Sequence, residues 1–285
     1  MSRTDFCLPE HHMVSYEMPM DKIRQKAIIT ENISIAPGVY SMWLETGTLQ
    51  EAAPGQFLLL YLPDRSRLLG RPFCIAELKE NRIRVVYRAA GAGTAELSRL
   101  TPNEEVYIEA PLGHGYPLDE EIIKGRKIAL IGGGLGAPSL LFLAEELKEK
   151  VTAEDSIRVV LGYRDSSMKR FLADDFISLG FETVISTDDG SEGIRGNVMD
   201  ALKETGYSPD LIYACGPMPM LSAVKKYASD EGAAAYISLE EHMACGVGVC
   251  LGCVTKTVKE DPHSHVRNAR VCTEGPVFDA RDVEI

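Results

Sequence analysis

Four cysteines near the C-terminus constrain this chain more than any other feature. They follow the spacing Cys245-x4-Cys250-x2-Cys253, and 18 further residues separate Cys253 from Cys272. This is the plant-type spacing of the ligands of a [2Fe–2S] cluster, which needs four thiolates around two irons. The glycine-rich stretch 246–249 allows tight turns that bring backbone N–H groups toward the cluster sulfurs. The spacing therefore predicts a loop-rich segment organised around a cluster.

Two other interpretations of these cysteines are open. Structural zinc also uses C-x2-C pairs, and His263 or His265 would supply a further ligand. However, zinc sites usually contain two such pairs, and Cys272 has no paired neighbour. A redox C-x-x-C at 250–253 is the second alternative, but the surrounding sequence lacks the βαβ pattern of that motif. The cluster is favoured over both.

Composition excludes several classes of protein. The chain has 285 residues and a formal net charge of −12. Such an acidic chain does not suit the phosphate backbone of a nucleic acid, so we expect no nucleic-acid partner. No stretch approaches the roughly 20 apolar residues of a membrane helix, and the N-terminus lacks the apolar core of a signal peptide. We therefore expect a cytoplasmic protein with no membrane association, in which the seven cysteines stay reduced.

The hydrophobic pattern changes near Lys124-Gly125. Before it, short β-like runs separated by turn residues predict an antiparallel barrel or sandwich, of which we expect the barrel. After it, apolar strands alternate with helical patterns, which is typical of a parallel sheet in an α/β domain. The sequence thus predicts an α+β multidomain chain, divided into an N-terminal extension (1–21), a β-barrel domain (22–122), an α/β nucleotide domain (123–235) and a small cluster domain (236–285).

A glycine-rich loop lies between the first predicted strand and helix of the α/β region. Its glycines allow close approach to a ligand, and the following helix would begin at Pro138. The alternative is a plain strand-to-helix turn, but the context favours a nucleotide-binding loop. It lacks the lysine of a P-loop. We predict that the nucleotide contacts Gly133, Gly134 and Gly136.

A second segment is expected beside this loop. Cys215, Gly216 and Pro217 end another predicted parallel strand, and ligands of such sheets bind at the carboxyl ends of the strands. Cys215 would then lie where a nicotinamide binds. The alternative, a buried structural thiol, is equally compatible with the sequence.

The barrel region contains a second phosphate-type pattern. Arg71 and Arg88 could grip a diphosphate, and the amides of Gly93 and Thr94 could do the same. Surface arginines and a helix N-cap threonine explain these residues almost as well. Two phosphate sites in two domains indicate two nucleotides that exchange something.

Together these motifs resemble the ferredoxin–NADP reductase superfamily. Within it, the tail SLEEHMACGVGVCLGC, followed by VCTEGPVFDA, is similar to the electron-transfer subunits of NAD-dependent class 1B dihydroorotate dehydrogenases. The resemblance covers residues 22–285. It implies that the cluster ligands are the four cysteines, and that FAD contacts Arg71, Pro72, Phe73, Cys74, Val86, Tyr87, Arg88, Gly93 and Thr94. Cys74 departs from the family's usual serine, and a thiol is a weaker hydrogen-bond partner.

The resemblance also implies the function. Electrons from dihydroorotate would pass from an FMN-containing catalytic subunit through the [2Fe–2S] cluster and FAD to NAD(H), in a heterotetramer with two copies of each subunit that serves pyrimidine biosynthesis. No catalytic acid, base or nucleophile is needed in this chain. Asp165 favours NAD over NADP, whereas Arg164 beside it would suit a 2′-phosphate. The alternatives are a similar subunit of a hydrogenase or of a ferredoxin–NADP transhydrogenase, and a zinc-stabilised nucleotide-binding module.

Overall fold

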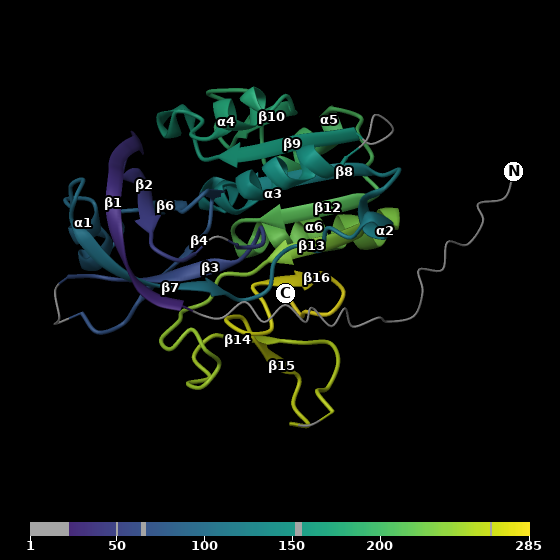
Figure 1. Cartoon of the computed structure of the whole chain (residues 1–285). Helices are drawn as coiled ribbons and strands as arrows, with labels where there is room; N and C mark the ends of the chain where they lie inside the picture. Colours follow the sequence, from purple (N-terminus) through teal and green to yellow (C-terminus); the bar gives the residue numbers. More distant parts are fainter. Residues whose placement is uncertain (1–22, 50, 64–66, 152–155, 263) are drawn as a thin grey trace, which may run out of the picture.

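The computed structural model describes residues 23–49, 51–63, 67–151, 156–262 and 264–285. Two seven-stranded sheets and a two-stranded ribbon form the molecule, and the C-terminal segment lies beneath both sheets (Figure 1). The extension expected at 1–21 lies outside the described residues.

The first sheet is antiparallel throughout, in the order β4-β3-β7-β1-β2-β6-β5. Its edge strands β4 and β5 are consecutive in the chain, and the Ala76 N–H between them donates to the Arg84 carbonyl at 2.9 Å, so the sheet curls into the predicted barrel. The strands are β1 Ile23–Ala36, β2 Val39–Thr46, β3 Phe57–Tyr61, β4 Arg71–Cys74, β5 Glu77–Lys79, β6 Arg82–Arg88 and β7 Glu105–Leu112; helix α1 is Ala92–Leu97.

Alternating burial explains why these segments form a barrel. In β7, Val106, Ile108 and Ala110 are buried inside, whereas Glu105 and Tyr107 face outward. Successive strand side chains point to opposite faces, so an apolar–polar alternation buries one face and solvates the other. The short strands β4 and β5 show no such run; the sequence marks Arg71–Cys74 only as the start of a strand and does not reveal β5.

The second sheet has the order β11-β10-β9-β8-β12-β13-β16. All of its pairs are parallel except β13–β16. Its strands are β8 Lys127–Gly133, β9 Ser156–Tyr163, β10 Glu182–Thr187, β11 Ile194–Arg195, β12 Leu211–Cys215, β13 Ala234–Ser238 and β16 Val277–Asp279. Its helices are α2 Glu120–Ile123, α3 Ala137–Lys150, α4 Ala173–Ser178, α5 Val198–Glu204 and α6 Met218–Glu231, with single 3-10 turns at Gly134–Gly136 and Ser166–Met168. No described helix is long and apolar enough to cross a membrane.

One helix is shorter than the sequence pattern indicates. The stretch MKRFLADDFISLG predicts a helix over residues 168–180, but α4 covers only six of them. Lys169, Arg170 and Leu172 have φ angles of 51°, 40° and 66°, which an α-helix cannot contain. The side-chain pattern is therefore helical while the backbone before Ala173 is a series of tight turns.

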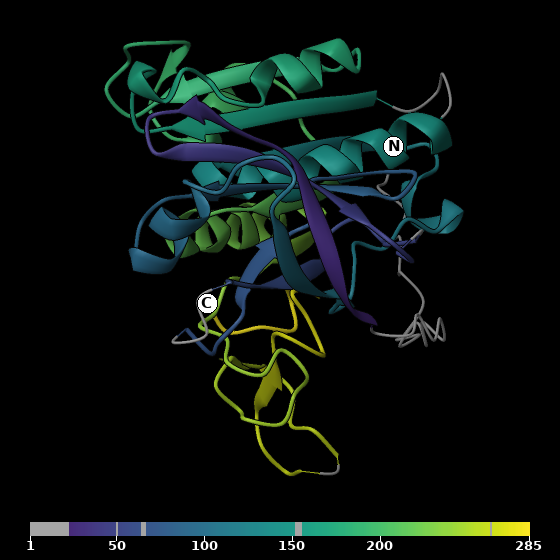
Figure 2. The same ribbon diagram turned by 60° about the vertical axis from the view of Figure 1, so that its left-hand side comes forward.

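The C-terminal segment, residues 240–285, is tied to both sheets (Figure 2). Strand β16 adds antiparallel to the edge of the second sheet, next to β13. Cys253 and Cys272 pack in one apolar cluster with Phe57 and Leu59 of the barrel. Strands β14 Val254–Lys256 and β15 Asn268–Arg270 pair antiparallel, so the long gap before Cys272 contains a hairpin.

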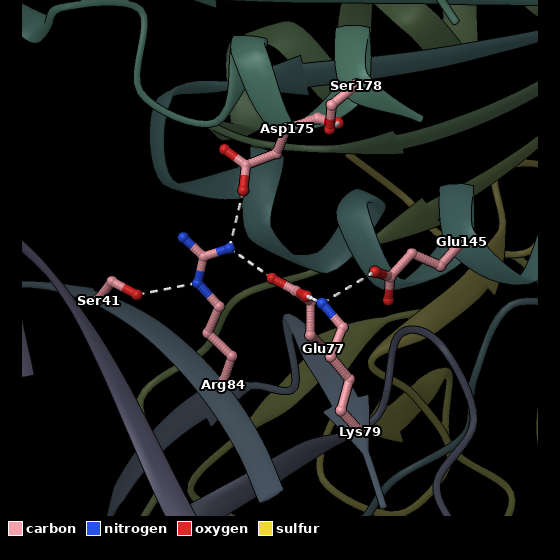
Figure 3. Close-up of polar contacts among 7 residues, drawn as sticks. All are labelled: Ser41, Glu77, Lys79, Arg84, Glu145, Asp175 and Ser178. Atoms are coloured by element: carbon pink, nitrogen blue, oxygen red, sulfur yellow. Dashed lines mark hydrogen bonds and ion pairs between the residues drawn. The ribbon is translucent and has the colours of Figure 1, made fainter. Parts of the chain in front are cut away.

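Ion pairs also hold the two sheets together (Figure 3). Arg84 Nη1 of the barrel lies 2.9 Å from Asp175 Oδ1 of α4, and it also pairs with the buried Glu77. Lys79 pairs with Glu77 as well, and its Nζ lies 3.6 Å from Glu145 Oε1 of α3. Desolvation and the nearby Glu77 carboxylate raise the pKa of Glu145 to about 7, although Lys79 opposes the shift.

Candidate functional site

The glycine loop and the end of β12 form one surface. Parallel pairing places Cys215 opposite Gly132, at the carboxyl ends of neighbouring strands. A Cβ on Gly136 would lie 2.0 Å from the Cys215 carbonyl oxygen, so only glycine allows this approach. Pro138 lies in the first turn of α3, as its missing N–H permits. The structure thus brings the loop and the Cys215–Pro217 segment together.

Cys215 lies at the centre of a buried group. Burial raises the pKa of its thiol to about 12, which keeps the thiol protonated and poorly nucleophilic at neutral pH. Burial raises the pKa of Cys74 as well, and electrostatic interaction with Cys215 adds to the shift, so the two thiols are neighbours from the two sheets.

A cleft of about 1250 Å³ opens between the barrel and the second sheet. That exceeds the roughly 300–1,000 Å³ of a usual small-molecule pocket, so it has room for parts of two ligands. Ten of the predicted cofactor residues line it: Pro72, Phe73, Cys74, Val86, Tyr87, Arg88, Gly133, Gly134, Cys215 and Pro217. Arg71, Gly93, Thr94, Gly136 and Gly216 lie outside its wall.

The barrel wall of the cleft is aromatic. Tyr87 stacks on Tyr40 with ring centroids 5.7 Å apart, and Phe73 packs at 5.4 Å on Tyr87. The Tyr87 hydroxyl donates to Asn32 Oδ1 at 2.9 Å, and burial raises its pKa despite that bond. Tyr87 is only 1% exposed, so it supports Phe73 at the wall of the cleft as a rigid ring and is not a titrating group.

Arg71 and the start of α1 form the second predicted phosphate pattern. A Cβ on Gly93 would lie 2.6 Å from Arg71 Nη2, so the guanidinium packs directly on this glycine. The alternative of an N-cap threonine is not what the structure has: Gly91 is the N-cap, and Thr94 Oγ1 accepts from the Ala90 and Gly91 N–H groups at 3.0 Å. Thr94 is the third residue of α1, and from there its side chain reaches back to the backbone N–H groups that precede the helix.

Polar residues at the carboxyl ends of the other strands complete the cleft. Arg164 and Asp165 both line it, and Asp165 Oδ1 accepts from the Ser167 N–H at 2.8 Å. Asp189 accepts from Ser191 and forms a turn, whereas Asp188 lines the cleft. Ser186 Oγ is buried and has no hydrogen-bond partner among the described residues. Sequence reasoning missed Ser186, Ser139 and Glu240, although the strand-end rule marks the positions of Ser186 and Glu240.

The four cysteines form two pairs. The Cys250 N–H points to Cys245 Sγ at 3.4 Å, and the Cys272 N–H points to Cys253 Sγ at 3.4 Å. The pairs are neighbours, because Gly248 of the loop between Cys245 and Cys250 packs on Thr273, the residue after Cys272. Two adjacent pairs of thiols match a cluster of two irons, in which each iron takes two cysteines.

The turns around Cys245 favour the ligating form of its sulfur. Burial disfavours the thiolate, but hydrogen bonds from the backbone of Cys250, Val247 and Val249 outweigh it and lower the pKa of Cys245 to about 6. Gly246 and Gly248 have φ angles of 67° and 82°, which allow the loop to turn its N–H groups inward. Burial and the neighbouring Cys253 instead raise the pKa of Cys272 to about 11.

This arrangement does not suit a single zinc ion. Within the part of the chain that the structure describes, no three His, Cys, Asp or Glu side chains gather closely enough to hold one metal ion. His265 is exposed and lies 3.5 Å from Glu260 at the tip of the hairpin, and His263 lies outside the described residues. A redox pair at 250–253 is equally poorly supported, because each of these thiols is paired with a different cysteine.

Comparison with known proteins identifies close relatives. Residues 240–284 match the family described as the iron–sulfur cluster binding domain of dihydroorotate dehydrogenase B. The chain is 38% identical over 265 residues to a protein of Geobacillus thermodenitrificans named dihydroorotate dehydrogenase B (NAD+), electron transfer subunit, covering 91% of this chain and 98% of that protein. A protein of the same name from Caldanaerobacter subterraneus subsp. tengcongensis is 36% identical over 260 residues, with the same coverage.

Solved structures share the fold. The structure of an NADH-dependent reduced ferredoxin–NADP oxidoreductase, described in connection with flavin-based electron bifurcation, is 27% identical with a TM-score of 0.78, over 90% of this chain and 89% of that one. A ferredoxin–NADP+ reductase from Neisseria gonorrhoeae with bound FAD and NADP is 14% identical with a TM-score of 0.63, over 73% and 92%. The second similarity concerns the fold alone.

Proposed function

Because this chain belongs to the family of dihydroorotate dehydrogenase B (NAD+) electron transfer subunits, we propose that it passes electrons between an FMN-containing catalytic subunit and NAD+. One observation carries the proposal: the paired cysteines and both walls of the cleft belong to one packed body. Cys253 and Cys272 share an apolar cluster with Phe57 of the barrel, and Phe57 also lines the cleft. A cluster and two nucleotides bound here would lie within one rigid frame.

The barrel side of the cleft is the site that we propose for FAD. Phe73 and Tyr87 would hold the flavin ring, and Arg71, packed on Gly93, would hold the diphosphate by charge-assisted hydrogen bonds. Cys74 departs from the serine that the resemblance implies, and its neutral thiol would give the flavin a weaker hydrogen bond. When bound, the flavin couples hydride transfer with the nicotinamide to single-electron transfer with the cluster, which neither of those groups does alone.

The second sheet supplies the nicotinamide side. The glycine loop and Cys215–Pro217 shape a surface that admits a flat ring next to the flavin site. Ser186, with its unpartnered hydroxyl, offers a hydrogen bond to a polar ligand in the cleft. Asp165 beside Arg164 suits the 2′-hydroxyl of NAD(H). The functional units that we propose remain the extension 1–21 and domains 22–122, 123–235 and 236–285, with strand β16 completing the second sheet.

The catalytic subunit would dock at the exposed edge of the cluster. Cys250 is exposed there, and Val249 and Leu251 on either side are 80% and 64% exposed. Exposed apolar side chains around a redox centre suit a protein partner that must approach it closely. We propose a heterotetramer with two copies of each subunit, located in the cytoplasm.

Anaerobic co-purification with the FMN subunit tests this function. The complex should contain iron, sulfide, FAD and FMN, and reduce NAD+ with dihydroorotate, whereas this chain alone should only reduce artificial dyes with NADH. A Val249→Asp variant should lose the catalytic subunit but keep its iron, its FAD and the dye activity; Val266→Asp on the hairpin tip is the matched control. The structural relative favours a second candidate, a subunit of a ferredoxin–NADP oxidoreductase. Ferredoxin-dependent turnover with no response to dihydroorotate would support that candidate instead.

A further inference from the structure

Thr273 carries a buried hydroxyl that the protein leaves without a partner. Its Oγ1 is inaccessible to solvent and makes no hydrogen bond with any residue that the structure describes. A buried hydroxyl without a hydrogen-bond partner is unfavourable, so such a group indicates an acceptor that does not belong to the polypeptide.

The position of Thr273 identifies that acceptor. It follows the ligand Cys272, and its Oγ1 lies 3.1 Å from the point that a Cβ on Gly248 would occupy. Gly248 belongs to the loop between Cys245 and Cys250, and its N–H interacts with Cys272. The hydroxyl is therefore enclosed by the turns that hold ligands of both irons, where the available acceptors are cluster sulfurs.

Arg270 approaches the same loop from strand β15. Its Nη1 points to the Gly248 carbonyl at 3.4 Å, and its Nε donates to Glu274 Oε2 at 2.8 Å. The Arg270 guanidinium also interacts electrostatically with Cys272. The positive charge of Arg270 thus lies beside the sulfur ligands, and the negative charge of Glu274 lies next to Arg270.

The chemistry of the cluster gives these contacts a consequence. Two irons held by four thiolates and two sulfides carry net negative charge, and reduction adds one electron with no bond formed or broken. Hydrogen-bond donors and cations beside the sulfurs stabilise the more negative, reduced state. We propose that Thr273 and Arg270 raise the reduction potential of this cluster, and that Glu274 partly offsets Arg270. The proposal rests on the cluster site of the proposed function.

The test is an EPR-monitored redox titration of the anaerobically purified complex with its catalytic subunit. Thr273→Val, which removes the hydroxyl at nearly constant volume, should lower the midpoint potential, and Thr273→Ser should retain it. Arg270→Gln should reduce the ratio of reduced to oxidised cluster at a fixed solution potential about tenfold, equivalent to about 59 mV for one electron. Glu274→Gln should shift the potential in the opposite direction.

Lys226→Gln on α6 removes one positive charge from an exposed i,i+4 pair and is the control for net charge. It should leave the potential unchanged. Unshifted potentials in both Thr273→Val and Arg270→Gln, or a lowered potential in Glu274→Gln, would overturn the proposal. If Arg270→Gln fails to assemble a cluster, the Val and Ser variants of Thr273 decide. A wild-type complex without iron or a [2Fe–2S] EPR signal would instead refute the cluster site itself, so the two failures are distinguishable.

Discussion

Arg84 and Asp175 connect the two sheets through one ion pair, with Nη1 and Oδ1 2.9 Å apart. The pair joins β6 of the barrel to α4 of the second sheet, next to the Glu77 carboxylate that also binds Arg84 (Figure 3). Arg84 is largely buried, so solvent screens this pair less than an exposed one. The relative placement of the two walls of the cleft therefore depends on specific charges as well as on apolar packing.

Asp175→Asn should lower the free energy of unfolding by about 1 kcal/mol, because Arg84 keeps Glu77 but loses the charge on α4. Asp174→Asn is the control, since its pair with Arg170 is exposed and should contribute less than about 0.5 kcal/mol. Urea unfolding of both variants measures the difference. Equal losses of unfolding free energy in the two variants would show that the ion pair between the sheets stabilises the protein no more than an exposed pair does.

Glu145 should make stability depend on pH. Its folded pKa of about 7 lies above the ordinary value of 4.5, so between these values the folded state binds the proton more tightly. The stabilisation is complete below pH 4.5 and is lost as pH rises through about 7. Between pH 5 and pH 8 the wild type should therefore lose about 2 kcal/mol relative to Glu145→Gln. Parallel stability curves for the two proteins would contradict this assignment.

Gly93→Ala should weaken flavin binding tenfold or more. The new Cβ would lie 2.6 Å from Arg71 Nη2 and displace the guanidinium from its proposed diphosphate contact. Gly91→Ala is a matched control two residues away, because its Cβ meets nothing within 4 Å and its φ of −136° suits alanine. Fluorescence titration of the flavin-free protein with FAD measures both. A loss of the same size in Gly91→Ala would point to the helix start rather than to Arg71.

Cys253→Ala and Cys250→Ala should each abolish the cluster, because each substitution removes one cysteine ligand from one of the two irons. Without iron they should differ in stability, since Cys253 is 3% exposed and packs in the core whereas Cys250 is exposed. The buried substitution should cost about 1 kcal/mol more. Iron analysis and urea unfolding of the cluster-free proteins measure the two effects. Cys215→Ala is the control for iron content and should keep the full cluster.

Most of the fold follows from local pattern. The apolar run at 127–133 predicted the central strand β8, and the pairing of β12 with β8 placed Cys215 beside the glycine loop, as strand-end logic required. The turns at 169–172 did not follow, because side-chain periodicity carries no information on the positive φ angles there. The spacing of the cysteines predicted the ligand set, but their division into two pairs arises from the three-dimensional turns.

Contacts between segments that are distant in the chain could not be predicted from the sequence. Arg71 packs on Gly93, which is 22 positions further along the chain, and neither segment contains a pattern that predicts this contact. The unpartnered hydroxyls of Ser186 and Thr273 are equally invisible, because burial without a partner is a property of the folded environment. The roles of Arg71 and its neighbours in binding FAD remain predictions.

Strand β16 has a consequence for how this architecture can be divided. It covers the open edge that β13 would otherwise present, and its backbone pairs with Tyr236, Ile237 and Ser238. A chain shortened before the cysteines would expose an unpaired strand of mostly apolar residues, a template for intermolecular association. The electron-carrying segment therefore also acts as a protective cover against aggregation, and its loss by proteolysis would lower solubility as well as redox activity.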